Sequence, residues 1–194
     1  MKRLAMTLAL IATLPALTAQ AQSDAVPVDQ AALASEAAAA ASSLGAALKT
    51  ELETALQKGG PVAALGVCRL KAPDIAARIS ADSNLDVRRT SLKPRNPLNA
   101  PNAWQVDVLR TFESRKAAGE DPSALSYSAL AEGEFRYMKA IPTAPVCLAC
   151  HGEVLAPEVS AKLAELYPHD QATGFRLGDL RGAFAIVKPL TAKH

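Results

Sequence analysis

Two of the three cysteines of the chain lie together in the stretch APVCLACHG, residues 144–152. Cys147 and Cys150 are separated by two residues, and His151 follows directly. This spacing is typical of a redox disulfide, of half a zinc site, or of covalent haem attachment. Each kind of site requires a different fold around it, so the rest of the sequence has to decide between them.

The first residues have the pattern of a removable export signal. MKR is positively charged, LAMTLALIATLPAL is apolar, and AQA has the small-x-small pattern of a cleavage site. We therefore predict a signal peptide of residues 1–21, cleavage after Ala21, and a periplasmic protein. The apolar run is shorter than the roughly 20 residues that span a bilayer, and no membrane span is predicted in the mature chain.

Charge and cysteine count exclude several classes of function. The chain has a formal net charge of +2, and the signal peptide removes Lys2 and Arg3, which leaves a neutral mature chain. A neutral chain gives no reason to expect binding to nucleic acid or to an anionic membrane. An odd number of cysteines in an exported protein argues against a purely structural disulfide framework, so Cys68 needs another explanation.

The first half of the mature chain is predicted to be helical. An alanine-rich helix that begins at Asp29 carries a leucine at every fourth position, and Gly59-Gly60 ends it. These leucines are Leu44, Leu48, Leu52 and Leu56. A second helix begins at Pro61 and places Cys68 on its apolar, inward face. Pro73 is predicted to break or kink this second helix.

The second half is predicted to mix strands and helices. LDVRRTS and GDLRGAFAIVKPL are predicted strands, and SYSALAEGEFRYMKAIP is a predicted hairpin that turns near Glu132-Gly133. AWQVDVLRTFESRKAAG and APEVSAKLAELYP are predicted helices, and the proline-rich stretch KPRNPLNAPN is a loop. A flexible leader, residues 22–28, would then precede one α+β domain, residues 29–194, with helices around a small antiparallel sheet.

This context favours haem attachment for Cys147 and Cys150. A thioredoxin-like pair opens a helix in a parallel βαβ unit, which is not predicted here, and a zinc site needs a second pair of ligands nearby. A chance local disulfide remains an alternative. In C-x-x-C-H the two thiols form thioethers with the two vinyl groups of one haem, and His151 becomes an axial ligand of the iron.

The residues alone leave the second axial ligand open. Met138, the only methionine left after processing, falls in a predicted strand and is expected to be a packing residue. His169 falls in a polar turn and is expected at the surface, and His194 is the terminal residue. Cys68 is either a soft ligand or a small core residue, which is a common role for a free cysteine.

Four motifs resemble the PAS-like c-type haem domain family. They are VCRLKAPDIA, RRTSLKPRNPLNAPNAW, FRYMKAIPTAPVCLACHG and YPHDQATGFRLGDLRGAFAIV, and together they extend from about Val67 to Val187. The structural prototype of this family is a soluble cyanobacterial protein with a Cys/His pair on the iron, and the domain also occurs as a sensor module in bacterial signalling proteins. The resemblance implies a single PAS-like domain, a central antiparallel sheet flanked by helices around one haem c.

The resemblance also implies a set of site residues. Cys147 and Cys150 would hold the haem covalently, while His151 and Cys68 would be its axial ligands. In the loop SLKPRNPLN, three residues are candidates for contacts to the haem propionates, because an arginine fork matches a carboxylate. These are Lys93, Arg95 and Asn96. The alternative is that they only fix the loop.

The implied chemistry is redox chemistry at low potential. A thiolate stabilises ferric over ferrous iron, and release of Cys68 on reduction would open a position for a diatomic gas. We therefore expect a redox or gas sensor, or a low-potential electron carrier, that acts on a separate redox or signalling protein. A periplasmic thiol oxidoreductase using Cys147 and Cys150 is the alternative, and a peroxidase is less favoured because two protein ligands would block the iron.

Overall fold

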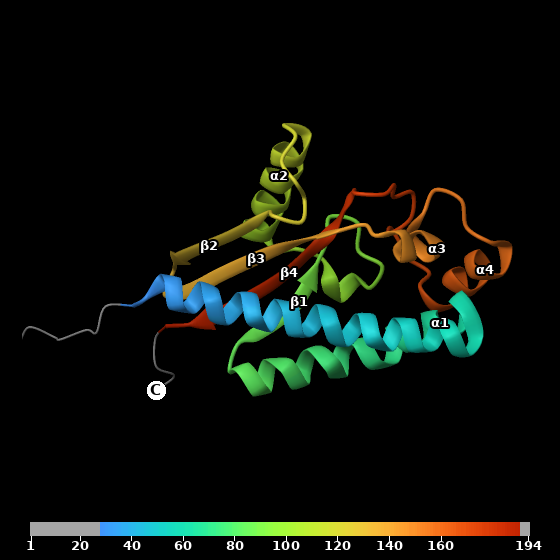
Figure 1. Cartoon of the computed structure of the whole chain (residues 1–194), viewed down its shortest axis with the longest axis horizontal. Helices are drawn as coiled ribbons and strands as arrows, with labels where there is room; N and C mark the ends of the chain where they lie inside the picture. Colours follow the sequence, from blue (N-terminus) through green and yellow to red (C-terminus); the bar gives the residue numbers. More distant parts are fainter. Residues whose placement is uncertain (1–27, 191–194) are drawn as a thin grey trace, which may run out of the picture.

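The computed structural model describes residues 28–190. The predicted signal peptide, nearly all of the predicted leader, and His194 lie outside these residues. Within them, a four-stranded antiparallel sheet separates a long folded-back helix, α1 (Gln30–Ser83), from a shorter helix, α2 (Ala103–Ala117) (Figure 1). This is the α+β architecture that the sequence predicts.

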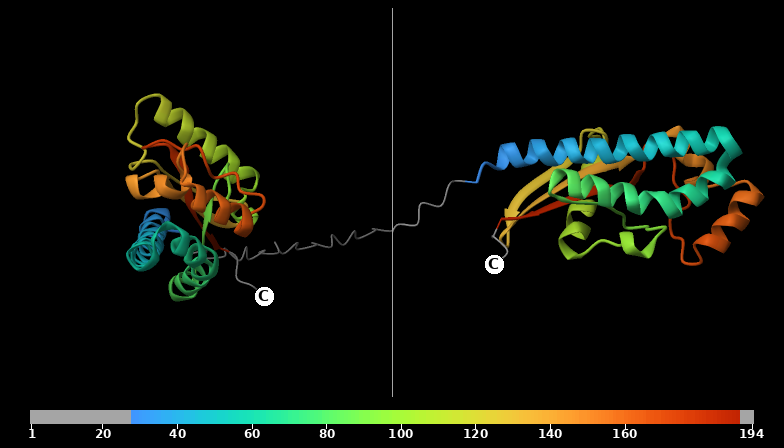
Figure 2. Two further views of the ribbon diagram at one scale, coloured as in Figure 1. Left: turned by 90° about the vertical axis from the view of Figure 1, so that its right-hand side faces the viewer. Right: turned by 90° about the horizontal axis from the view of Figure 1, so that it is seen from below.

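Helix α1, Gln30–Ser83, is folded back on itself by two glycines. The Asp29 carboxylate accepts hydrogen bonds from the backbone N–H groups of Ala31 and Ala32 at 3.0 Å and begins the helix as predicted. Gly59 and Gly60 leave helical geometry, and Gly60 has φ +68°, which favours glycine. The chain therefore reverses at this point, and the two arms of α1 run side by side (Figure 2).

The predicted break at Pro73 is wrong, because the second arm stays helical through this residue. Proline deprives the carbonyl four residues earlier, that of Arg69, of its partner. Arg69 and Pro73 both lie on the exposed face of the arm, where water can satisfy that carbonyl. Of the residues that the structure describes, α1 alone is long and apolar enough to cross a membrane, a test that a core helix also passes.

The sheet has the order β1-β4-β3-β2. Its strands are β1 (Asp86–Thr90), β2 (Ser126–Ala131), β3 (Glu134–Pro142) and β4 (Leu180–Pro189). β2 and β3 form the predicted hairpin, and its turn residues Glu132 and Gly133 both have positive φ. The last strand of the chain thus lies between the first strand and the hairpin.

Alternation along the two central strands divides the core into two layers. Phe135 and Tyr137 on β3 and Ile186 on β4 pack against α1, whereas Met138 and Ala185 pack against α2. Helix α2, Ala103–Ala117, begins with a capping box between Asn102 and Gln105. This two-sided burial explains why both central strands are rich in apolar residues.

The remaining elements lie at one end of the sheet, with α3 and α4 close to the turn of α1 (Figure 1) and η1 directly after β1. They are the 3-10 helices η1 (Pro97–Asn99) and η2 (Pro145–Cys147) and the helices α3 (Leu148–His151) and α4 (Pro157–Leu166). Thr143, just after β3, accepts a hydrogen bond from the Gly178 N–H at 2.9 Å and donates one to the Asp179 carbonyl at 2.7 Å. The segment with the cysteine pair is therefore anchored directly to the central strand.

Candidate functional site

The Cys-x-x-Cys-His segment forms η2 and α3, two tight turns that follow β3. Gly152 ends the segment, and its N–H donates to the Leu148 carbonyl at 3.0 Å. A Cβ atom at position 152 would lie 2.6 Å from that carbonyl oxygen, so the tight turn requires glycine here. Cys147, Cys150 and His151 are consequently held on one compact loop.

His151 is oriented by the segment that precedes β4. Its Nδ1 lies 2.7 Å from the Ala172 carbonyl oxygen, which can only accept, so Nδ1 carries the proton and Nε2 keeps its lone pair. The His151 carbonyl accepts from the Phe175 N–H at 2.9 Å, and the Phe175 ring stands edge-on to the imidazole with centroids 6.3 Å apart. This arrangement of hydrogen bonds is typical of a metal-binding histidine.

The electrostatics of the site keep His151 neutral. Burial, followed by the positive charges of Arg181 and Arg95, lowers the pKa of His151 to about 2. Protonation therefore does not compete for Nε2 at neutral pH, and a neutral imidazole is the form that binds metals.

The two neighbouring cysteines are free and half-buried. Cys150 packs at the edge of a small apolar cluster formed by Leu65 of α1 with Val159 and Leu163 of α4. Burial raises the pKa of the Cys150 thiol, with Arg95 opposing the shift. Thiol oxidoreductases use thiols whose pKa is lowered, so this environment does not favour that chemistry.

Cys68 lies on the inward side of the second arm of α1 but is exposed. At about 100° of rotation per residue it falls between the buried residues Ala72 and Ile75. The side predicted from spacing is thus the observed one, and the exposure of Cys68 argues against the alternative that it is a core residue. Desolvation by nearby atoms raises the pKa of the Cys68 thiol, an effect that Arg89 and Arg95 oppose.

Cys68 and Cys150 belong to one site although they are far apart in sequence. A negative charge on Cys68 would raise the pKa of both Cys150 and Tyr167. It would also raise the pKa of Arg89, which favours the protonated guanidinium. The turn of α1 brings this arm against α4, which follows the cysteine pair (Figure 1).

An excess of positive charge surrounds these groups. Arg89 and Arg95 both act on Arg181, and among residues 28–190 the carboxylate paired with this group is Asp170, which binds Arg95. Burial, followed by the charges of Arg95 and Arg89, lowers the pKa of Arg181 to about 10. Three clustered arginines with one carboxylate favour an anionic ligand.

The three candidate anion contacts have different surroundings. Arg95 is buried, and its donors go to Asp170 and to two backbone carbonyls. Asn96 caps η1 by accepting from the Leu98 N–H at 3.0 Å. The Lys93 Nζ lies 5.4 Å from the centre of the Phe175 ring, beside the site.

The other two candidate ligands lie where the sequence predicts. Met138 is fully buried against α2, and His169 is exposed. Arg89, Arg181 and Asp170 were missed by sequence reasoning. All three stand inside the motifs RRTS, GDLRG and YPHD, but charge alone did not distinguish them from surface residues.

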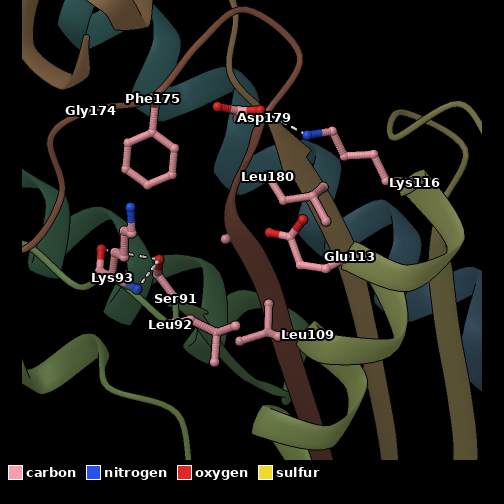
Figure 3. Close-up of a pocket in the computed structure, with 11 residues that line it drawn as sticks. Ser91, Leu92, Lys93, Leu109, Glu113, Lys116, Gly174, Phe175, Asp179 and Leu180 are labelled. Atoms are coloured by element: carbon pink, nitrogen blue, oxygen red, sulfur yellow. Dashed lines mark hydrogen bonds and ion pairs between the residues drawn. The ribbon is translucent and has the colours of Figure 1, made fainter. Parts of the chain in front are cut away.

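A cavity of about 300 Å³ is lined by Phe175, the residue whose ring contacts His151, and by Lys93 (Figure 3). Leu109 and Leu180 line this cavity, and so do Lys116 and Asp179, which form an ion pair 2.8 Å long. Glu113 of α2 also faces this space (Figure 3).

No group of three or more His, Cys, Asp or Glu side chains within residues 28–190 could hold a metal ion by itself. The donors of this site are instead one imidazole nitrogen and three thiols, spread over α1 and the η2–α3 segment.

Comparison with known proteins decides the family. The sequence profile of the Tll0287-like family matches residues 16–189. The chain belongs to the Tll0287-like family. The crystal structure of the cyanobacterial heme-protein Tll0287 is similar, with a TM-score of 0.55 and 33% sequence identity, over 66% of this chain and 74% of that chain. A search of curated proteins found no match.

Membership of the Tll0287-like family confirms the resemblance that the four sequence motifs indicate. The observed sheet and helices confirm the α+β, PAS-like fold class. The matched residues, 16–189, include all the site residues described above.

Proposed function

We propose that this chain is an exported haem protein that holds one haem c through Cys147 and Cys150. His151 Nε2 and the Cys68 sulfur would be the axial ligands. The relative Tll0287 is described as a heme-protein. The observation that carries the proposal is the neutral His151, whose Nδ1–H is fixed on the Ala172 carbonyl. Its Nε2 keeps a lone pair that could coordinate the iron, and the Arg181 Nε, which lies 3.4 Å from this nitrogen, would then have to move aside.

The surroundings fit such a group in two further respects. A haem carries two propionates, and Arg89 and Arg181 supply positive charge that Asp170 does not offset. Cys68 is the uncovered position on an otherwise buried side of its helix. Lys93, Asn96 and the remaining donor of Arg95 stay candidates for propionate contacts.

The ligand set supports a redox role. A bound haem supplies one-electron chemistry, and a thiolate ligand favours its ferric form, which gives a low potential. The chain would then act in the periplasm as a low-potential electron carrier, or as a sensor of redox state or of a diatomic gas. Either role requires a separate redox or signalling protein as partner.

The mass of the purified protein tests covalent attachment. The chain is produced with its export signal in a bacterium that has the haem-attachment machinery, and its intact mass is measured after denaturation. We expect the mass of the chain cleaved after Ala21 plus about one haem. Cys147→Ser/Cys150→Ser should lose the added mass, and an unmodified wild-type mass would contradict the proposal.

The ligand role of Cys68 has its own test. Cys68→Ala should keep the covalent haem but lose the low-spin thiolate signature of ferric iron, and added imidazole should then bind. The potential should rise, because the ligand that favours ferric iron is absent. A variant with the wild-type electron-spin resonance spectrum and potential would show that Cys68 is no ligand.

A further inference from the structure

A buried ion pair joins two loops behind His151. Arg95 in the loop after β1 and Asp170 in the loop after α4 form a bond of 3.0 Å, and their side chains are only 9% and 10% exposed. Two charges are costly to remove from water unless their remaining polar atoms are also satisfied. The contacts that satisfy this pair indicate what it is for.

Every further side-chain hydrogen bond of the pair goes to Cys150, which precedes His151, or to Ala172, which binds the His151 ring. The Arg95 Nη2 donates to the Cys150 carbonyl at 2.5 Å and to the Ala172 carbonyl at 3.2 Å. The second oxygen of Asp170 accepts from the Ala172 N–H at 2.8 Å. The Ala172 carbonyl is the same group that accepts from His151 Nδ1.

The pair therefore fixes both the backbone from which the imidazole extends and the residue to which its ring is hydrogen-bonded. Arg95 holds the peptide group that immediately precedes His151. Arg95 also donates to the Ala172 carbonyl, which accepts from the ring, and Asp170 accepts from the N–H of the same residue. The backbone bond from the Gln171 N–H to the Pro94 carbonyl, 3.1 Å long, braces the same two loops.

We propose that Arg95 and Asp170 are positioning residues that fix the rotation and proton of His151 and so set the potential of the bound iron. This inference rests on the proposed function. The guanidinium draws electron density from the Ala172 carbonyl, which weakens the hydrogen bond from Nδ1 and makes the imidazole a weaker donor. Its positive charge also favours ferrous iron, and the carboxylate of Asp170 acts in the opposite sense.

The two residues should therefore shift the potential in opposite directions. Arg95→Gln removes a positive charge and strengthens the donation from His151, so the midpoint potential should fall. Asp170→Asn keeps the acceptor for the Ala172 N–H but removes a negative charge, so the potential should rise. Arg95→Lys keeps the charge and should stay near the wild-type potential, with a broader ferric electron-spin resonance spectrum because the fork is lost.

The control is a second ion pair on the same segments. Arg176 follows Phe175 and Glu153 follows Gly152, and they form an exposed pair 2.8 Å long with side chains 75% and 52% exposed. Arg176→Gln and Glu153→Gln make the same charge changes, but these residues do not contact the Cys150 or Ala172 carbonyl, and solvent screens them. Both control variants should keep the wild-type potential.

The measurement is a redox titration of each purified protein with its haem attached. Opposite shifts for Arg95→Gln and Asp170→Asn, with unshifted controls, support the positioning role. Shifts in one direction, or shifts no larger than those of the controls, overturn it. If Arg95→Gln does not fold, Asp170→Asn and Arg95→Lys decide: a raised potential in the first alone supports the role, and equal potentials overturn it.

The failure of this inference can be distinguished from failure of the proposed function. A wild-type protein without added haem mass overturns the proposed function before any titration. A wild-type protein with covalent haem, in which the charge variants behave like the controls, overturns only the role of Arg95 and Asp170.

Discussion

His151 shows how a single side chain is specified by atoms distant from it in sequence. The ring is held by the Ala172 carbonyl, its backbone carbonyl by Phe175, and the preceding peptide by Arg95. The partners of His151 in these contacts, which are Arg95, Ala172 and Phe175, all lie outside the regular helices and strands. The geometry of the site therefore comes from loops that meet the short helix α3 at one end of the sheet.

Met138 and His169 are candidate ligands that we do not expect to bind the iron, so replacing them tests the ligand assignment. Met138 is fully buried in the α2 layer and His169 is exposed. Met138→Leu and His169→Gln should both leave the visible and electron-spin resonance spectra of the ferric protein unchanged. Met138→Leu should cost less than about 1.5 kcal/mol of stability. Conversion of low-spin to high-spin iron by either change would show that the axial assignment is wrong.

Gly182 of β4 lies against the last residue of β1, Thr90. It has φ +152°, and a Cβ atom there would lie 2.2 Å from the Thr90 carbonyl oxygen. Gly182→Ala must displace backbone, so unfolding by urea should show a loss of roughly 1–3 kcal/mol. Because Arg181 is the adjacent residue and contacts His151, the ferric spectrum should change as well.

A stability of Gly182→Ala equal to that of the wild type would mean that the close approach to Thr90 relaxes without cost. Gly66→Ala is the matched control, since a Cβ atom there meets nothing within 4 Å.

The site was predictable from sequence only where it is local. The spacing of Cys147, Cys150 and His151 is a complete motif on its own, whereas the residues alone left Cys68 open between ligand and core residue, and only the family resemblance implied that it is a ligand. Arg95 was singled out for a contact to the haem, whereas its observed partners are Asp170 and two carbonyls. Such partners come together only through the tertiary fold, and no periodicity in the sequence encodes them.

Helix α1 illustrates the same limit at the scale of elements. Its start at Asp29 and its turn at Gly59-Gly60 follow from local chemistry and were predicted. Pro73 was predicted to interrupt this helix. The proline is tolerated because it lies on the exposed face of the helix, and that position cannot be deduced from the residue itself. The apolar residues of the β2–β3 hairpin, of α2 and of α4 recur with a clear period, and each element was predicted correctly as strands or helix.

The turn of α1 should depend strongly on one glycine. Gly60 combines φ +68° with ψ −167°, a region that is nearly closed to other residues, so Gly60→Ala should cost about 1–3 kcal/mol. Gly66 lies in the regular part of the second arm, so Gly66→Ala should stabilise the protein by about 0.5–1 kcal/mol. Thermal unfolding of the two variants checks both signs, and a similar change in both would contradict this account.

On the scale of the whole molecule, the α1 layer and the α2 layer pack on opposite faces of the same sheet. An ion pair connects the α2 layer to the chain before β4. Lys116 near the end of α2 binds Asp179 just before β4 at 2.8 Å. The hydrogen bond from Lys116 is the main cause that lowers the pKa of Asp179, and the Arg176 N–H adds to it. This pair fastens the α2 layer to the chain that leads into the central strand.

The Lys116–Asp179 pair should make stability depend on acid. Because the pKa of Asp179 is lower in the folded protein, its contribution is present above about pH 4 and is lost as pH falls through the folded value. Lys116→Met should therefore lower stability at pH 7, by less than about 1 kcal/mol for a partly exposed pair, and much less at pH 3.

Urea unfolding at pH 7 and pH 3 measures this difference. Lys162→Met is the control, because its partner Glu165 lies one turn away on the same helix, α4, and joins no layers. A loss in Lys116→Met that is the same at both pH values would contradict the assigned role of Asp179.

The position of β4 has a consequence for the order in which the chain can fold. β4 is the last strand in the sequence, yet it pairs with both β1 and β3. A chain that emerges from its N-terminus cannot close the sheet until residues 180–189 have appeared. The segment with Cys147, Cys150 and His151 emerges earlier, and the Ala172 and Phe175 contacts that enclose His151 come after it. The thiols of Cys147 and Cys150 therefore emerge before the finished domain closes around them, and an enzyme can reach them during that time.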